Sequence, residues 1–155
     1  MLGLAWIALI FLREHHFAWA WIVLVIALVA FSDIGAYFAG RQFGNRKLAV
    51  EVSPGKTWEG FWGGMSASLL LALVVMLSVG ERFFAGVQLS HMMVVVVLVS
   101  SLSVIGDLSL SMLKRVAGVK DSGALLPGHG GVLDRIDGML SAVPVFACLM
   151  WLLGW

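Results

Sequence analysis

Apolar residues along the chain gather in five stretches, at roughly residues 1–12, 18–39, 61–79, 92–113 and 138–155. A helix needs about 20 residues to cross ~30 Å of hydrocarbon, so the middle three are long enough and the last is just sufficient. The first is shorter, and Arg13-Glu14-His15-His16 follows it where a signal peptide would show a small-residue cleavage site. We therefore interpret it as a curtailed helix. The pattern predicts an all-α, polytopic transmembrane helix bundle of about five spans, forming one domain over residues 1–155.

Composition supports a membrane protein. The chain is 61% hydrophobic and 12% charged, whereas soluble chains carry about 25% charged residues. Its seven Trp and nine Phe suit the aromatic belts of membrane interfaces. The single Cys148 lies in an apolar run, which excludes a disulfide framework and a cysteine-based metal site. The sequence has no basic stripe of the kind that would indicate a nucleic acid as partner.

The basic residues predict an orientation. Of the ten Lys and Arg residues, eight fall in two loops: Arg41, Arg46, Lys47 and Lys56 at 40–60, and Lys114, Arg115, Lys120 and Arg135 at 114–137. The other two connections hold only Arg13 and Arg82. Because cytoplasmic loops are enriched in Lys and Arg, both basic loops are expected in the cytoplasm, with the protein in the inner (plasma) membrane.

Asp107 lies near the end of the fourth apolar stretch, where a carboxylate is costly. It belongs to a polar stripe at helical spacing: Ser100, Ser103, Asp107, Ser111 and Lys114. One interpretation is a polar seam between helices, with Asp107 held by serine hydroxyls or by Lys114. The other is a functional site, which intramembrane carboxylates usually mark.

Three further carboxylates fall on the same predicted side of the membrane. Asp33 is expected to end the second span, with Tyr37 one turn on and Gly40-Arg41 closing the helix. The alternative for Asp33 is a helix-end carboxylate that reaches interfacial water. Asp134 and Asp137 are three residues apart and would share a helix face; capping of the last helix is the alternative role. Since a hard cation collects oxygen ligands from several elements, Asp33, Asp107 and Asp134 are expected to converge.

Between these carboxylates lies a short polar turn, His129-Gly130-Gly131. Glycines let a phosphate approach backbone N–H groups, and the start of a following helix favours an anion. Together with the basic residues of this loop, the turn indicates a metal-dependent site for phosphates.

The other basic loop contains Ser53-Pro54-Gly55-Lys56-Thr57, whose PGKT resembles the end of a Walker A loop. A full Walker A motif would need glycine at position 50, which is Val50, and we expect no strand before it, so a P-loop is rejected. What remains is a turn presenting Lys56 and Thr57. Contact with a phosphate and anchoring at the interface both stay open.

With these residues in view, the chain resembles phosphatidate cytidylyltransferases. The likeness rests on the run Ser111-x-Leu113-Lys114-Arg115-x4-Lys120-Asp121-x-Gly123-x2-Leu126-Pro127-x-His129-Gly130-Gly131-Val132-x-Asp134-Arg135-Ile136-Asp137. Upstream, Asp33-x3-Tyr37, Gly40-Arg41, Phe43-Gly44 and Ser53-Pro54-x-Lys56-Thr57-x-Glu59-Gly60 fit as well. The resemblance runs from about residue 20 onward and corresponds to the C-terminal half of a typical member. Leu110 departs from it, because the family usually has an acidic residue there.

The resemblance implies transfer of CMP from CTP to phosphatidate, giving CDP-diacylglycerol and pyrophosphate at the face of a lipid bilayer. It places Mg²⁺, and a candidate second cation, at Asp107 and Asp134, with Asp33 and Asp137 as further candidate ligands. Lys114, Arg115, Lys120 and Arg135 would clamp phosphates, with His129, Asp121 and Asp137 beside them. Substrate contacts would come from Ser53, Lys56, Thr57, Ser111, Gly130 and Gly131.

Two other functions stay open at this point. One is a CTP-dependent lipid kinase of the polyprenol or phytol type. The other is a catalytically inactive membrane chain that serves as an assembly subunit. We also expect a homodimer, because the third span carries small residues suited to close packing: Gly60, Gly63, Gly64, Ser66 and Ser68.

Overall fold

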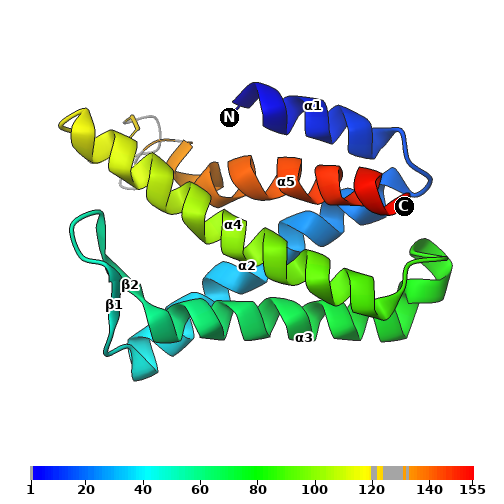
Figure 1. Cartoon of the computed structure of the whole chain (residues 1–155), viewed down its shortest axis with the longest axis horizontal. Helices are drawn as coiled ribbons and strands as arrows, with labels where there is room; N and C mark the ends of the chain where they lie inside the picture. Colours follow the sequence, from blue (N-terminus) through cyan, green and yellow to red (C-terminus); the bar gives the residue numbers. More distant parts are fainter. Residues whose placement is uncertain (1, 120–121, 124–130, 132) are drawn as a thin grey trace.

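Five helices and one β-hairpin make up the part of the chain that the structure describes (Figure 1). This computed structural model describes every residue except 1, 120–121, 124–130 and 132, and it describes no side chain at 134 and 135. The elements are α1 (Leu2–Arg13), α2 (Ala18–Phe43), β1 (Lys47–Ala49), β2 (Ser53–Thr57), α3 (Trp58–Phe83), α4 (Leu89–Val116) and α5 (Leu133–Leu153). The predicted helical bundle is confirmed.

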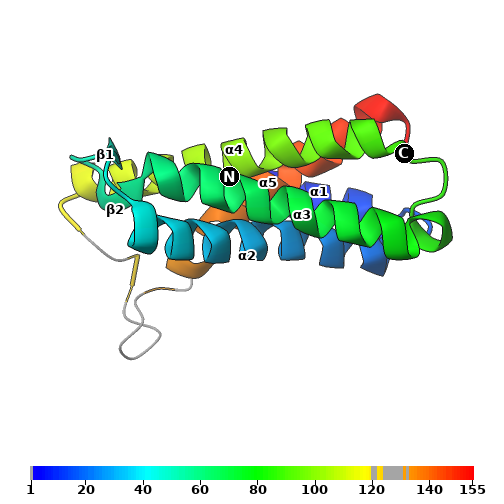
Figure 2. The ribbon, with the colours of Figure 1, turned by 90° about the horizontal axis from the view of Figure 1, so that it is seen from below.

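Four of these helices are long and apolar enough to cross a membrane: α2, α3, α4 and the part of α5 from residue 136. The remaining helix, α1, has 12 residues and packs along α5. The bundle is elongated, with the hairpin at one end and the α3–α4 connection at the other (Figure 2). Aromatic rings contact one another at both ends, as interfacial belts do: Trp58, Phe61 and Trp62 beside the hairpin, and Trp21, Phe83, Phe84 and Trp155 at the far end.

The apolar core occupies the half of the bundle that lies far from the hairpin. Its largest fully buried side chains include Leu28, Met92, Phe146 and Met150. Toward the hairpin end the buried positions become polar, with Ser32, Ser100 and Ser103 all nearly inaccessible. A bundle packed in this way leaves its hairpin end free to hold polar groups.

Glycines bring the backbones of α2 and α3 into close contact. A Cβ added at Gly63 would lie 2.2 Å from the Cβ of Ala39, and one at Gly64 would lie 2.5 Å from the carbonyl oxygen of Ser32. One turn further along, the hydroxyl of Ser68 donates to the carbonyl oxygen of Leu28 at 2.9 Å.

This contact occupies most of the surface that we expected at a dimer interface. Gly60, Gly64 and Ser68 are buried within the chain, and Ser66 is exposed. Because α2 covers these buried residues, a dimer contact on the third span or its neighbours would use other residues. The homodimer itself stays a prediction.

The loop between α2 and α3 is an antiparallel hairpin, so the expectation of a plain turn without strands was also wrong. Lys47 pairs with Thr57, and Ala49 with Ser53. Two contacts fasten the base of the hairpin to α3: the N–H of Trp58 donates to the carbonyl oxygen of Arg46 at 2.9 Å, and the N–H of Arg46 donates to both carboxylate oxygens of Glu59 at 3.2 Å. The PGKT residues lie in β2 itself, so a Walker A loop stays excluded.

We predict that Gly63→Ala destabilises the protein by about 1–3 kcal/mol, because overpacking at a close contact forces the two helices apart. Gly80→Ala in the same helix is the matched control, since its added Cβ would meet only Met76, at 3.6 Å. Unfolding in mixed micelles, followed by circular dichroism, gives both values. Equal stability of the two variants would contradict the close contact.

Candidate functional site

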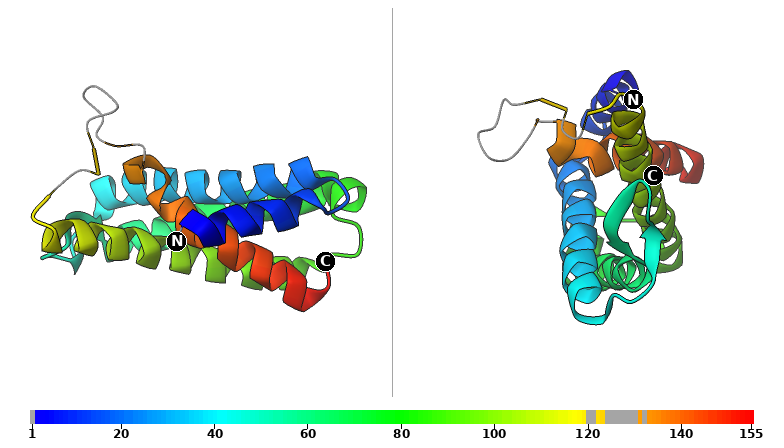
Figure 3. Two further views of the ribbon diagram at one scale, coloured as in Figure 1. Left: turned by 90° about the horizontal axis from the view of Figure 1, so that it is seen from above. Right: turned by 90° about the vertical axis from the view of Figure 1, so that its left-hand side faces the viewer.

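A polar pocket lies where α2, the hairpin, α3, α4 and α5 meet at one end of the bundle. Its volume is about 200 Å³. The charged and hydroxyl-bearing residues that line it are Ser32, Asp33, Tyr37, Lys56, Thr57, Ser103, Asp107 and Asp137. Seen from the end and from above, the hairpin lies across this end of the bundle (Figure 3).

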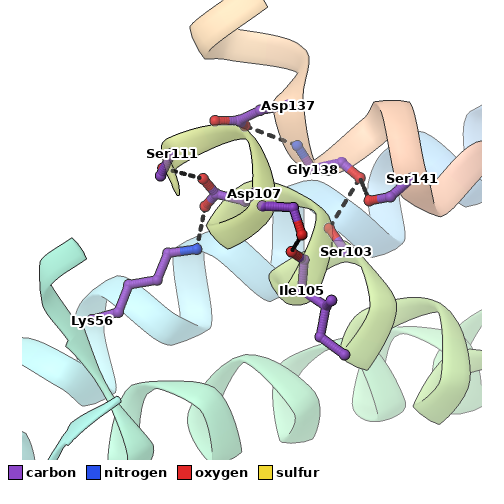
Figure 4. Close-up of polar contacts among 9 residues, drawn as sticks. Lys56, Ser103, Ile105, Asp107, Ser111, Asp137, Gly138 and Ser141 are labelled. Carbon is purple, nitrogen blue, oxygen red and sulfur yellow. Dashed lines mark hydrogen bonds and ion pairs between the residues drawn. The ribbon is translucent and has the colours of Figure 1, made fainter. Parts of the chain in front are cut away.

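An ion pair between Lys56 and Asp107 joins the hairpin to α4 (Figure 4). The Nζ of Lys56 donates to Oδ2 of Asp107, and the two side chains are 27% and 26% exposed. On the other side, Ser111 Oγ donates to Oδ1 at 3.4 Å. The hairpin thus supplies the cation that compensates this carboxylate.

Close packing of α4 on α5 brings Asp137 beside Asp107 (Figure 4). Gly106 makes this possible, since a Cβ there would lie 2.0 Å from Ser141 Oγ. Ser103 Oγ donates across the interface to the carbonyl oxygen of Gly138 at 3.2 Å. Ser103 therefore makes the expected seam between helices, and Asp107 lines the pocket; the functional role of Asp107 stays a prediction.

Asp33 reaches the same pocket from α2, as does Tyr37 one turn later. α2 ends at Phe43, close to the closure at Gly40-Arg41 expected from the sequence, so Asp33 lies in the second half of the helix. The phenol of Tyr37 accepts a hydrogen bond from Arg41 Nη1 at 3.1 Å. Three carboxylates, those of Asp33, Asp107 and Asp137, therefore line one hollow together with one lysine.

This donor set suits a hard divalent cation. Mg²⁺ keeps several water ligands and is usually held by one or two carboxylates plus substrate phosphates, and Asp107 and Asp137 supply two adjacent carboxylates. Among the described residues no three side chains of His, Cys, Asp or Glu gather closely enough to enclose an ion.

Several predicted site residues lie in the described part of the chain but do not line the pocket. Ser53 is the first residue of β2 and lies next to the hairpin turn. Lys114 and Arg115 lie in the last turn of α4. Gly131 packs against the backbone of Ser122 and Gly123, where a Cβ on it would lie 2.8 Å from the nitrogen of Gly123.

Thr57 lines the pocket, but its hydroxyl has a structural partner. It is the N-cap of α3: its Oγ1 accepts from the N–H of Gly60 at 3.1 Å, and the residue is 5% exposed. The capping bond stabilises the junction of β2 with α3 and so holds the neighbouring Lys56 in place.

The remaining predictions concern residues of the loop before α5. Lys120, Asp121, His129 and Gly130 lie outside the described residues. Asp134 and Arg135 lie in the first turn of α5, and their side chains are not among those described. The shared metal ligation by Asp107 and Asp134 stays a prediction.

Sequence reasoning missed the part that β1 plays, although a signal was present. Leu48 lines the pocket from β1. Leu48, Val50 and Val52 favour extended backbone, although only Lys47–Ala49 forms the strand and residues 50–52 form the hairpin turn.

The site and the fold define a polytopic membrane protein with a carboxylate-lined pocket at one end of its helices. The model of the cytidylyltransferase family matches residues 1–153, and the chain belongs to that family. It is 49% identical over 151 residues to a phosphatidate cytidylyltransferase of Pseudomonas aeruginosa, covering 97% of this chain and 55% of that protein.

Two other relatives agree. A phosphatidate cytidylyltransferase of Haemophilus influenzae is 48% identical over 126 residues, covering 81% of this chain and 44% of the relative. One of Brucella suis is 44% identical over 153 residues, covering 98% and 53%. The resemblance drawn from the sequence is confirmed, and the chain spans about half the length of the curated relatives it matches.

We predict that Lys56→Met destabilises the protein by about 1–2 kcal/mol, because it leaves the Asp107 carboxylate partly buried without its cation. The double variant Lys56→Met/Asp107→Asn should regain most of this loss. Lys47→Met, at an exposed position of the neighbouring strand, is the control. Strictly additive effects of the two single substitutions on the free energy of unfolding would show that the pair is not coupled.

Proposed function

We propose that this chain carries the site that transfers CMP from CTP to phosphatidate, giving CDP-diacylglycerol and pyrophosphate. The observation that carries the proposal is the convergence of Lys56, Asp107 and Asp137 at one end of an apolar bundle. A pocket in that place serves a reaction between a water-soluble nucleotide and a lipid. The names of the relatives support the same assignment.

In the proposed reaction a phosphate oxygen of phosphatidate attacks the α-phosphorus of CTP. The bond from that phosphorus to the oxygen bridging the α- and β-phosphates breaks, and pyrophosphate leaves with the bonding electrons. Both reactants are polyanions, so cationic groups must offset their repulsion and hold the attack in line.

Lys56 is placed to take part in that compensation. Its ammonium lies in the pocket on a hairpin, with Asp107 as its partner. We propose that its ammonium donates to a substrate phosphate when both substrates are bound. Lys114, Arg115, Lys120 and Arg135 are the proposed further phosphate contacts, and Asp121 and His129 are proposed to lie beside them.

The proposed metal is Mg²⁺, with a second cation as a further candidate. Asp107 and Asp134 would hold it, and Asp33 and Asp137 are the further candidate ligands. Such an ion, when bound, supplies positive charge that stabilises the phosphate oxygens in the transition state.

We predict that the purified protein, given CTP, Mg²⁺ and phosphatidate in mixed micelles, releases pyrophosphate and forms CDP-diacylglycerol. Asp107→Asn should lower kcat about 10²–10³-fold, because a group that organises the transition-state charge is lost. Glu51→Gln changes an exposed acid at the hairpin turn, outside the pocket lining, and should leave turnover unchanged.

The products separate this proposal from its alternatives. Formation of CDP and a phosphorylated lipid alcohol would assign the chain to the CTP-dependent lipid kinases. A folded protein that yields no product from either substrate would assign it to the inactive assembly subunits. Wild-type turnover in Asp107→Asn would remove that carboxylate from the mechanism.

We also propose that the pocket faces the cytoplasm from the inner membrane. Eight of the ten basic residues fall in the two loops at 40–60 and 114–137. The hairpin and the end of α4 lie at the same end of the bundle, opposite the α3–α4 connection (Figure 2).

Labelling of single cysteines in intact cells tests this orientation. Glu51→Cys at the hairpin turn and Ala85→Cys in the α3–α4 connection are exposed positions at opposite ends. The natural Cys148, which is exposed, is first replaced by serine. A membrane-impermeant maleimide added from outside should label position 85 and spare position 51 until the cells are lysed. The reverse pattern would place the pocket on the wrong side for cytoplasmic CTP.

A further inference from the structure

An apolar groove runs along the outside of the bundle between α3 and α4. Its volume is about 730 Å³. It is lined by Ser66, Leu69, Leu70, Leu73, Met93, Val94, Val97 and Leu98. Ser66 is the single polar residue in this set, and its hydroxyl is bonded to the carbonyl oxygen of Trp62 at 2.8 Å. The groove therefore offers an apolar ligand a surface without unsatisfied polar groups.

Both the groove and the polar pocket are lined in part by residues of α3 and α4. Phe61 and Val104 line the pocket, and Ser66 and Leu98 line the nearer end of the groove. At 1.5 Å per residue these positions are about 8–9 Å apart along each helix. From the pocket to the far end of the groove, at Leu73 and Met93, is about 17 Å, and one leaflet of a bilayer core is ~15 Å deep.

From this geometry we propose that the α3–α4 groove holds an acyl chain of the lipid substrate while the phosphate of that lipid lies in the pocket. The inference rests on the proposed function. The interval between the two hollows is where the glycerol and ester groups would lie. Such a lipid enters sideways from its leaflet, without leaving the membrane.

The contribution of the groove is to orient the bound lipid. A chain moving from lipid to an apolar groove gains little from burial, because the surrounding tails are equally apolar. Fixing the chain along α3 and α4 instead sets the direction from which the phosphate enters the pocket, which favours in-line attack.

A helix of a second copy fits this groove less well. Helices in membranes approach one another through small residues. Apart from Ser66, the groove residues are Leu, Val and Met, and most of them are exposed, with Leu70 at 63% and Val94 at 58%.

Photolabelling tests the proposal without requiring turnover. The probe is phosphatidate that carries a diazirine midway along one acyl chain, added to the wild-type protein in phosphatidylcholine nanodiscs. Crosslinks should concentrate at 66–73 and 93–98, and excess unlabelled phosphatidate should remove them while excess phosphatidylcholine should not. Labelling spread equally over other lipid-facing positions, such as Val74 and Leu77, would show ordinary bilayer contact and overturn the proposal.

Kinetics give a second test. Leu70→Trp fills the groove and should lower kcat/KM for dioleoyl-phosphatidate about tenfold more than for dibutanoyl-phosphatidate, whose chains end before Leu70 when the ester groups lie between the two hollows. Val74→Trp is the matched control, since Val74 lies one turn along the same helix, is 60% exposed and does not line the groove.

The outcomes separate this inference from the proposed function. Equal losses with both lipids in Leu70→Trp would indicate general disruption and overturn the groove assignment. If the wild-type protein turns over neither lipid, the proposed function fails. The photolabelling pattern alone then decides whether the groove binds the chain of an anionic lipid.

Discussion

The close contact of α2 with α3 is the constraint on which the site depends. Gly63 and Gly64 let the two backbones approach to a distance that no larger residue allows. The hairpin of β1 and β2 joins these two helices at the end of the bundle. Thr57 lies at the narrow junction between the hairpin and the two helices. A Cβ added to Gly40 would lie 3.1 Å from Thr57 Oγ1, and one added to Gly44 would lie 2.9 Å from Thr57 Cγ2.

That junction determines the position of the Lys56 ammonium group. Lys56 precedes Thr57, which is fixed by its capping bond to Gly60. The lysine consequently reaches across to Asp107 on α4, a residue 51 positions later in the chain. Removing either charge would leave the other partly buried at the hairpin end of the bundle, which is costly in a membrane. The packing of small residues and the pairing of charges are in this way parts of one arrangement.

The sequence predicted most of the fold and some of the site. Hydrophobic stretches located all five helices, since length and apolarity decide which segments enter a bilayer. The spacing of Ser103 and Asp107 predicted that both lie on one face of their helix. The cation that pairs with Asp107 could not be identified, because that pairing depends on how α2, the hairpin and α4 meet. Small residues on α3 indicated close packing, yet nothing in their spacing told whether the partner was α2 or a second chain.

The proposed chemistry follows from a pocket in which carboxylates outnumber the lysine that balances them. A divalent ion and two phosphate-bearing substrates would complete that balance, with Lys56 free to change partner. The most direct test follows the phosphorus atoms of CTP. Phosphatidate is incubated with the protein and CTP labelled with ³²P at either the α- or the γ-position, and the lipid is extracted and counted. The account predicts label in the lipid from α-labelled CTP only, whereas label from γ-labelled CTP would show phosphoryl transfer and contradict it.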